Sequence, residues 1–198
     1  MPDTQPTTSP VGDLRGRVAL VTGVGRKRGI GSAVCRALAS RGANVAFSYW
    51  RDYDRETPGA PEEDEPEALL GELRAIGVGA EGVEVDLSLP DSARLLLDGA
   101  EEVLGRPSIL VNVAAYSSRD SFEDLDARTL DAHYAVNPGP TDTGWMTEEL
   151  EQELIHKFPL GRIGQPGDVA RLVAFLASEE AAWITGQIIH SEGGFSRS

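Results

Sequence analysis

The run 17–22, apolar from Val18 to Val21, and the glycine-rich turn that follows it constrain the fold more than any other part of the sequence. The run consists of strand-forming residues, and the turn contains Gly23, Gly29 and Gly31 before a helical pattern begins in 32–39. In doubly wound α/β proteins, a strand, a glycine turn and a helix in this order present backbone N–H groups and a helix N-terminus to a pyrophosphate. The stretch therefore predicts a dinucleotide-binding site.

The spacing of the glycines departs from the strict G-x-G-x-x-G pattern, because Arg28 stands where a third glycine should follow Gly23 and Gly25. Taken alone, these glycines also fit a flexible strand–helix connection that binds nothing. The rest of the chain favours the binding site, since strand and helix patterns alternate up to residue 137. Further strands are expected at 44–50, 81–87 and 108–112, with helices at 69–76, 90–104 and 125–136. This alternation predicts a parallel sheet with helices on both faces.

Length and composition indicate one domain, since the chain has 198 residues and 40% of them are apolar. We expect residues 1–14 to be a disordered polar tail and residues 15–198 to form a single Rossmann-like domain. The sequence contains no run of about 18 apolar residues, so no membrane span is expected. The net charge of −14 argues against nucleic acid and anionic membranes as partners. The single cysteine, Cys35, excludes an internal disulfide, which suits a cytoplasmic protein.

Several short motifs follow one another along the chain. They are Thr22-Gly23 with Gly29-Ile30-Gly31, Asp86-Leu87, Asn112-Val113-Ala114-Ala115, Pro138-Gly139-Pro140-Thr141-Asp142-Thr143, Gly161-Arg162-Ile163-Gly164-Gln165-Pro166, and Ile184-Thr185-Gly186-Gln187 with Gly193-Gly194. With these motifs the chain resembles the short-chain dehydrogenase/reductase family over residues 15–196, and most of all its 3-oxoacyl-(acyl-carrier-protein) reductases. The resemblance implies an NAD(P)-dependent oxidoreductase that interconverts a small carbonyl compound and an alcohol.

The same resemblance implies which residues bind the cofactor. Phosphates would lie against the glycine turn, the adenine beside the third strand, and the adjacent ribose beside the fourth strand. The expected cofactor-binding residues are Gly23, Arg28, Gly29, Ile30, Gly31, Arg51, Asp86, Leu87, Asn112, Ala114, Pro138, Gly139 and Thr143.

The end of the second predicted strand favours NADP(H) over NAD(H). An acidic residue there would bind the ribose hydroxyls of NAD, but this chain offers the stretch 48–51, which ends in Arg51. Arg26, Lys27 and Arg28 add positive charge in the glycine turn and would suit a 2′-phosphate. The alternative is that all of these are ordinary surface cations.

The catalytic motif of the family is absent. The family uses a serine, a tyrosine that acts as general acid, and a lysine four residues after that tyrosine, whose charge lowers the tyrosine pKa. This chain has two lysines, Lys27 and Lys157, and the residues four positions before them are Gly23 and Glu153. The four tyrosines are Tyr49, Tyr53, Tyr116 and Tyr134, and lysine follows none of them at that spacing. We therefore assign no catalytic residue and no metal ligand.

The missing motif points to an internal deletion between Asn137 and Pro138. The resemblance implies that two sequence motifs, which are separated in family members, are adjacent at this point. The resemblance implies that a whole βαβ unit, roughly 30 residues or more, is lost there. We expect a Rossmann-like, doubly wound parallel sheet truncated by this loss, and impaired catalysis. The alternative is a non-catalytic nucleotide-binding or oligomerising remnant.

The deletion would remove two strands beside the fourth strand of the family order 3-2-1-4-5-6-7. A gap in the sheet beside the fourth strand would be too unstable to persist. Each buried unpaired backbone group costs about 1–3 kcal/mol, against a total stability of about 5–15 kcal/mol. Our hypothesis is that a last strand, expected at residues 184–190, moves in beside the fourth, which predicts hydrogen-exchange protection at residues 187–189. The alternatives are that another subunit fills the edge, giving a homo-oligomer, or that the chain folds poorly.

Overall fold

The computed structural model describes residues 14–56, 64–114, 138–184 and 189–195. The expected helix at 125–136, most of the expected tail, and residues 185–188 of the predicted last strand lie outside these residues. The expected boundary of the tail was wrong by one residue, because Leu14 is only 1% exposed and belongs to the core. Its N–H group donates to the carbonyl of Arg41 at 2.8 Å, which fixes the start of the folded part.

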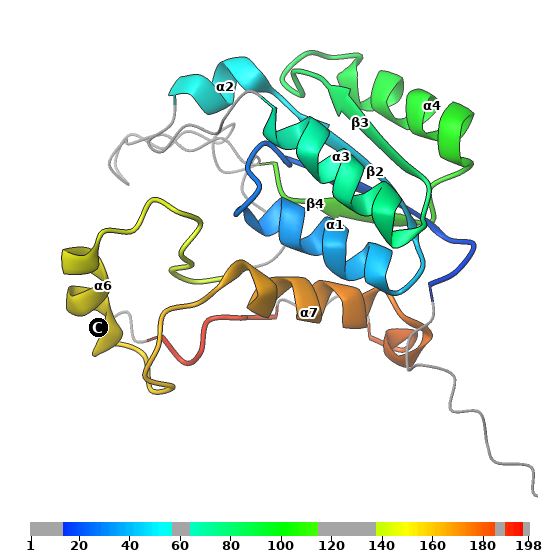
Figure 1. The fold of residues 1–198 in the computed structure, drawn as a ribbon. Helices are drawn as coiled ribbons and strands as arrows, with labels where there is room; N and C mark the ends of the chain where they lie inside the picture. The colour runs from blue at the N-terminus through cyan, green and yellow to red at the C-terminus, as the bar shows by residue number, and fades with distance from the viewer. Residues whose placement is uncertain (1–13, 57–63, 115–137, 185–188, 196–198) are drawn as a thin grey trace, which may run out of the picture.

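Four parallel strands form the sheet, in the order β3-β2-β1-β4 (Figure 1). Their bounds are Val18–Thr22 for β1, Asn44–Tyr49 for β2, Ala80–Glu84 for β3 and Ile109–Asn112 for β4. The predicted doubly wound parallel sheet and its first four strands are confirmed. Two strands end earlier than expected, at Tyr49 and Glu84, because the chain turns there into the loops that reach α2 and α4.

Helices cover both faces of this sheet (Figure 1). On one face, α1 (Ile30–Ser40) packs between α3 (Glu65–Ile76) and α7 (Pro166–Leu176). On the other face lies α4 (Ser92–Leu104). The alternation of side chains along β1 explains this arrangement, because Ala19 and Val21 pack toward α1 while Leu20 packs toward α4.

Three shorter helical segments complete the described part of the chain: α2 (Arg51–Glu56), α6 (Glu148–Ile155) and the 3-10 turn η2 (Glu179–Ala181). The sequence between Met146 and Phe158 predicts a helix, and α6 confirms it, whereas α2 was not expected. Between β4 and α7, the loop that begins at Pro138 is held by a parallel bridge between Thr141 and Gly164.

One carboxylate, Asp168, organises the start of α7. It accepts the N–H of Gln165 at 2.9 Å and receives two hydrogen bonds from the guanidinium of Arg162, at 2.7 and 2.8 Å. Arg171 adds a bond of 2.5 Å from the next turn of the helix. The bonds from Arg162 are the main reason that the pKa of Asp168 falls from its ordinary value of 3.8 to about 2.

We predict that Asp168→Asn lowers the free energy of unfolding by about 1–2 kcal/mol at pH 7. Because the folded-state pKa is depressed, the ionised carboxylate stabilises the fold above pH 3.8, and this contribution disappears as the pH falls through about 2. Urea denaturation of both proteins at pH 7 and near pH 2 measures the difference. Asp98→Asn is the control, since its exposed ion pair with Arg94 should contribute less than about 0.5 kcal/mol. An Asp168 effect that does not change with pH would contradict the assignment.

Candidate dinucleotide-binding site

The glycine turn lies where the carboxyl ends of β1 and β4 meet. Gly23 has a φ of +73°, and a Cβ atom at this position would lie 2.4 Å from the backbone nitrogen of Ala114. The hydroxyl of Thr22 accepts the N–H groups of Val113 and Ala114, both at 3.2 Å, so it fixes the end of β4 against the turn. A side chain at position 23 has no room, which leaves a backbone-only surface at the carboxyl edge of the sheet.

The next part of the turn leads into α1. A Cβ atom at Gly31 would lie 2.8 Å from the carbonyl oxygen of Gly23, so the helix starts in close contact with the turn. Gly29 is the N-cap residue, no side chain caps the helix, and its first turn holds no acidic residue. Such an N-terminus presents backbone N–H groups and the positive end of the helix dipole to an anion.

The turn between Gly23 and Gly29 is closed by hydrogen bonds. The carbonyl of Arg26 accepts the N–H of Gly29 at 2.9 Å and the hydroxyl of Ser32 at 2.6 Å. The carbonyl of Lys27 accepts a bond of 2.9 Å from the guanidinium of Arg36 on α1. The turn is therefore anchored to α1.

The residues expected to flank the adenine and the ribose lie at the same edge of the sheet. Asp86 and Leu87 follow β3, where the carboxylate of Asp86 accepts the N–H of Ser88 at 2.9 Å and Leu87 packs on the core below α4. Asn112 ends β4 and is in register with Thr22 of β1. All of these residues follow carboxyl ends of parallel strands, which is where ligands of open α/β sheets bind.

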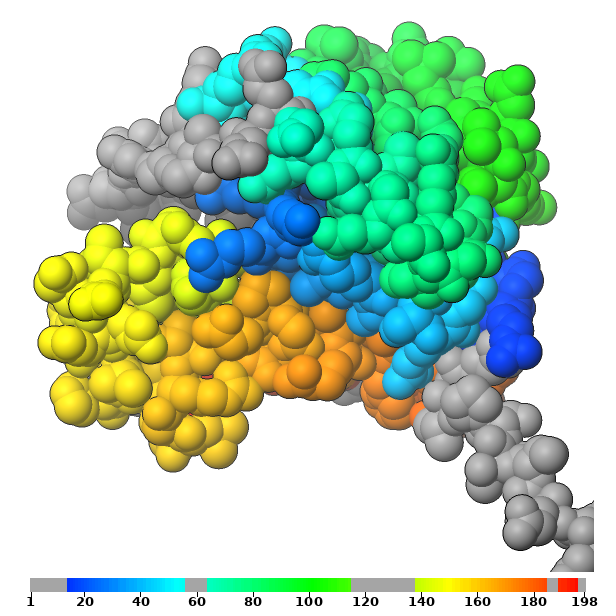
Figure 2. Space-filling model, viewed as in Figure 1, coloured from blue at the N-terminus to red at the C-terminus, as the bar shows by residue number. Residues whose placement is uncertain are grey.

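The distant loop 138–144 reaches the glycine turn. The guanidinium of Arg28 lies 3.4 Å from the carboxylate of Asp142. A Cβ atom at Gly144 would lie 3.9 Å from the same guanidinium. Figure 2 shows this contact as yellow atoms beside the blue atoms of the turn. The structure therefore brings the loop that contains Pro138, Gly139 and Thr143 to the glycines that precede it by more than a hundred residues.

Lys27, Arg28 and Arg51, which were expected to suit a 2′-phosphate, each pair with an acidic side chain. Lys27 lies 2.9 Å from Glu72, and Arg28 pairs with Asp142. Arg51, at the start of α2, contacts Glu84 and lies 2.5 Å from Glu67. Sequence reasoning missed these partners because they come from α3, β3 and the distant loop. A phosphate would have to replace or share these carboxylates.

A further acid, Asp54 of α2, was also missed. Its carboxylate lies against Gly25, where a Cβ atom would come within 1.8 Å of the carboxylate oxygen. Burial raises the pKa of Asp54, and the charge of Arg26 opposes that shift. The sequence offered no motif for this contact, because α2 is short and carries no apolar periodicity.

The side chains expected to have no catalytic role show structural contacts. Tyr49 stacks below the guanidinium of Arg51, 4.8 Å from it, and Tyr53 stacks on Trp50. Burial raises the pKa of the Cys35 thiol far above its ordinary value, which makes it a poor nucleophile. Among the described residues, no group of His, Cys, Asp and Glu could hold a metal ion. No helix in the same part of the chain has the length and apolar character needed to cross a membrane.

Comparisons with known proteins agree with this geometry. The oxidoreductase YjdA of Bacillus subtilis, itself uncharacterized, is 35% identical over 253 positions, which cover 91% of this chain and 97% of YjdA. The 3-oxoacyl-(acyl-carrier-protein) reductase FabG of Staphylococcus aureus is 24% identical over 250 positions, covering 89% and 96%. Both alignments are longer than the 198 residues of this chain, so both relatives contain residues that it lacks.

Solved structures share the fold. A double mutant of a Serratia marcescens short-chain dehydrogenase/reductase has a TM-score of 0.76 at 24% identity, covering 93% of this chain and 99% of the other. A blue fluorescent protein from a metagenomic library, solved with NADPH, has a TM-score of 0.75 at 25% identity with the same coverage.

Two family models match the sequence. The model described as short chain dehydrogenase matches residues 17–163, and the one described as Enoyl-(Acyl carrier protein) reductase matches residues 133–196. The first covers well over half of the chain and includes the whole described sheet. The chain therefore belongs to the short-chain dehydrogenase/reductase family of oxidoreductases, whose members bind a nicotinamide dinucleotide.

Proposed function

We propose that this chain binds NADP(H) at the carboxyl edge of its sheet and is impaired in the carbonyl–alcohol interconversion of its family. The observation that carries the binding site is the backbone-only surface at Gly23, where Ala114 leaves no space for a Cβ atom. The uncapped N-terminus of α1 lies beside this surface and suits the pyrophosphate. The proposed binding set is the thirteen residues expected from the sequence.

The preference for NADP(H) is supported by the chemistry at the end of β2. Arg51 is the first residue of α2, two positions after this strand ends, and its guanidinium is held in place by Tyr49, Glu67 and Glu84. A guanidinium can bind a phosphate through two parallel N–H bonds, which would compensate for a lost carboxylate partner. The similar blue fluorescent protein was solved with NADPH.

Thermal melts with increasing NADPH or NADH test this proposal, because a ligand that binds only the native state raises its stability by mass action. We predict a larger shift with NADPH. Arg51→Ala should weaken NADPH binding about tenfold or more, as expected for one charge-assisted contact, and change NADH binding much less. Arg55→Ala is the matched control on α2, because Arg55 pairs with the exposed Asp52. Equal affinity for the two cofactors would refute the preference.

The proposed impairment rests on the absent tyrosine and lysine pair and on the relatives' additional residues. We place the deletion at 137/138, within one domain that begins at Leu14, and we propose a small carbonyl or alcohol as substrate if turnover remains. The non-catalytic alternative, a nucleotide-binding module of the cytoplasm, shares the cofactor site and differs only in turnover. A turnover assay therefore separates the two.

A further inference from the structure

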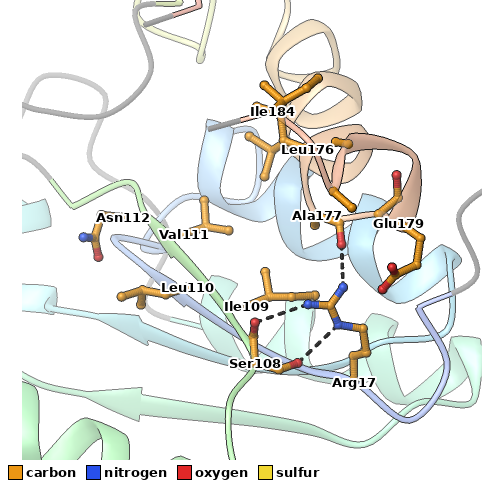
Figure 3. A pocket seen from close by; sticks show the side chains of 14 residues that line it. Arg17, Ser108, Ile109, Leu110, Val111, Asn112, Leu176, Ala177, Glu179 and Ile184 are labelled. Atoms are coloured by element: carbon orange, nitrogen blue, oxygen red, sulfur yellow. Dashed lines mark hydrogen bonds between the residues drawn. The ribbon is translucent and has the colours of Figure 1, made fainter. Parts of the chain in front are cut away.

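A hollow of about 510 Å³ lies beside β4, on the face covered by α7 (Figure 3). Its walls are largely apolar and include Ile109, Val111, Leu176, Ala181 and Ile184. Arg17 closes one end, since its guanidinium donates to the carbonyl of Ala177 at 2.7 Å and to the hydroxyl of Ser108 at 3.3 Å. The end of α7 is therefore tied to the start of β4, with the hollow between them.

The hollow runs along the edge of β4 that faces away from β1. The N–H of Ser108 donates to Val18 at 2.9 Å, so every second residue of β4 directs its backbone groups to β1. Ile109 and Val111 alternate with the residues that bond to β1. They direct their N–H and C=O groups away from β1. Within the described residues, no strand pairs with that side of β4. Such an edge is a template for another strand.

The edge lacks the features that usually prevent pairing between chains. The strand Ile109–Asn112 contains no charged residue and no proline, although the chain carries a net charge of −14. Leu110 is 61% exposed, whereas Leu20, its neighbour in register on β1, is 1% exposed. The uncharged apolar strand is therefore suited to pairing with a second apolar strand.

We propose that β4 is an interface between two copies of this chain, which pair antiparallel through a two-fold axis at Leu110. In this register, Ile109 lies opposite Val111 of the partner subunit, and the backbone groups that face outward on both strands can bond to each other. Registers that bring Pro107 into the pairing lose a donor, because proline has no N–H. The strand is thus self-complementary in one central register.

The hollow accepts the side chains that this pairing delivers. Ile109 and Val111 point to the face of α1 and α7, and directly opposed residues of an antiparallel pair share a face. The partner's Ile109 and the partner's Val111 would therefore enter the hollow, beside Leu176 and Ile184. Across the axis, Leu110 would contact Leu110 of the partner subunit on the opposite face.

A cysteine at the axis tests the proposal directly. Opposed Cα atoms in a pair without backbone hydrogen bonds are about 4.5 Å apart, within the range of a disulfide. We expect oxidised Leu110→Cys to form a covalent dimer, because Cys35 is buried and does not compete. Leu95→Cys is the matched control, since Leu95 on α4 is 60% exposed and lies away from β4. Equal cross-linking of the two variants, or none with Leu110→Cys, would overturn the proposal.

Sedimentation and hydrogen exchange of the unmodified chain give a second test. We expect a reversible dimer, and Leu110→Lys should weaken it at least tenfold because two ammonium groups would meet at the axis, while Leu95→Lys should not. The amides of Ile109 and Val111 should gain protection as the concentration rises. Protection that is independent of concentration would show that the chain's own last strand covers the edge, and would overturn the proposal. A chain that stays monomeric would also overturn it.

Discussion

Gly23→Ala should abolish cofactor binding and lower the free energy of unfolding by about 2–5 kcal/mol. The left-handed backbone, with a φ of +73°, costs a residue with a Cβ atom about 1–2 kcal/mol. The added atom would also lie 2.4 Å from the backbone nitrogen of Ala114, and overpacking of this kind costs about 1–3 kcal/mol more. Relief of the clash requires β1 and β4 to separate at the edge where the dinucleotide is proposed to bind.

The chain contains a close control for this substitution. Gly16 has a φ of +75° at the opposite end of β1, and a Cβ atom there would meet nothing within 4 Å. Gly16→Ala should therefore show the backbone cost alone, about 1–2 kcal/mol, and keep the thermal shift with NADPH. Urea denaturation and NADPH titration of both variants measure the two effects separately.

Equal destabilisation of the two variants would mean that the contact with Ala114 does not matter. A Gly23→Ala protein that still binds NADPH with unchanged affinity would contradict the proposed binding surface. Because the control has the same backbone conformation, neither result could be assigned to left-handed strain.

The predictable part of this fold was the part dictated by local patterns. Apolar runs of strand formers and the glycine turn between 17 and 31 were sufficient for the sheet and for the start of α1. The order β3-β2-β1-β4 came from the family resemblance and was confirmed. These features depend on residues that are near one another in sequence, or on motifs that a family repeats.

The acidic surroundings of the site were not predictable in the same way. Glu67, Glu72 and Asp142 reach the glycine turn or Arg51 from elements far along the chain, and their positions alone indicated only solvated charges. Asp54 was missed because α2 has six residues and no apolar face to signal it. Leu14 was assigned to the tail because its neighbours are polar, yet burial against the core decides its place.

The largest effect should appear in turnover. We predict that the pure chain binds NADPH but reduces carbonyl compounds at least about 10²–10⁴-fold more slowly than a version with a complete catalytic segment, because that is what a positioned general acid contributes. The insertion, placed between Asn137 and Pro138, would come from an active family member and carry its serine, tyrosine and lysine with both strands. Oxidation of NADPH with a panel of small ketones and aldehydes measures the rate.

The matched control is the same insertion with its tyrosine replaced by phenylalanine, which restores the missing strands without the general acid. If this control binds NADPH and remains slow, the deficit of the present chain is chemical. If the intact insertion is also slow, the inserted strands do not enter the sheet, and hydrogen exchange at Ile109 and Val111 will report an edge that is still open. If the unmodified chain is as fast as the intact insertion, a group of its own must supply the proton, and the proposed impairment is wrong.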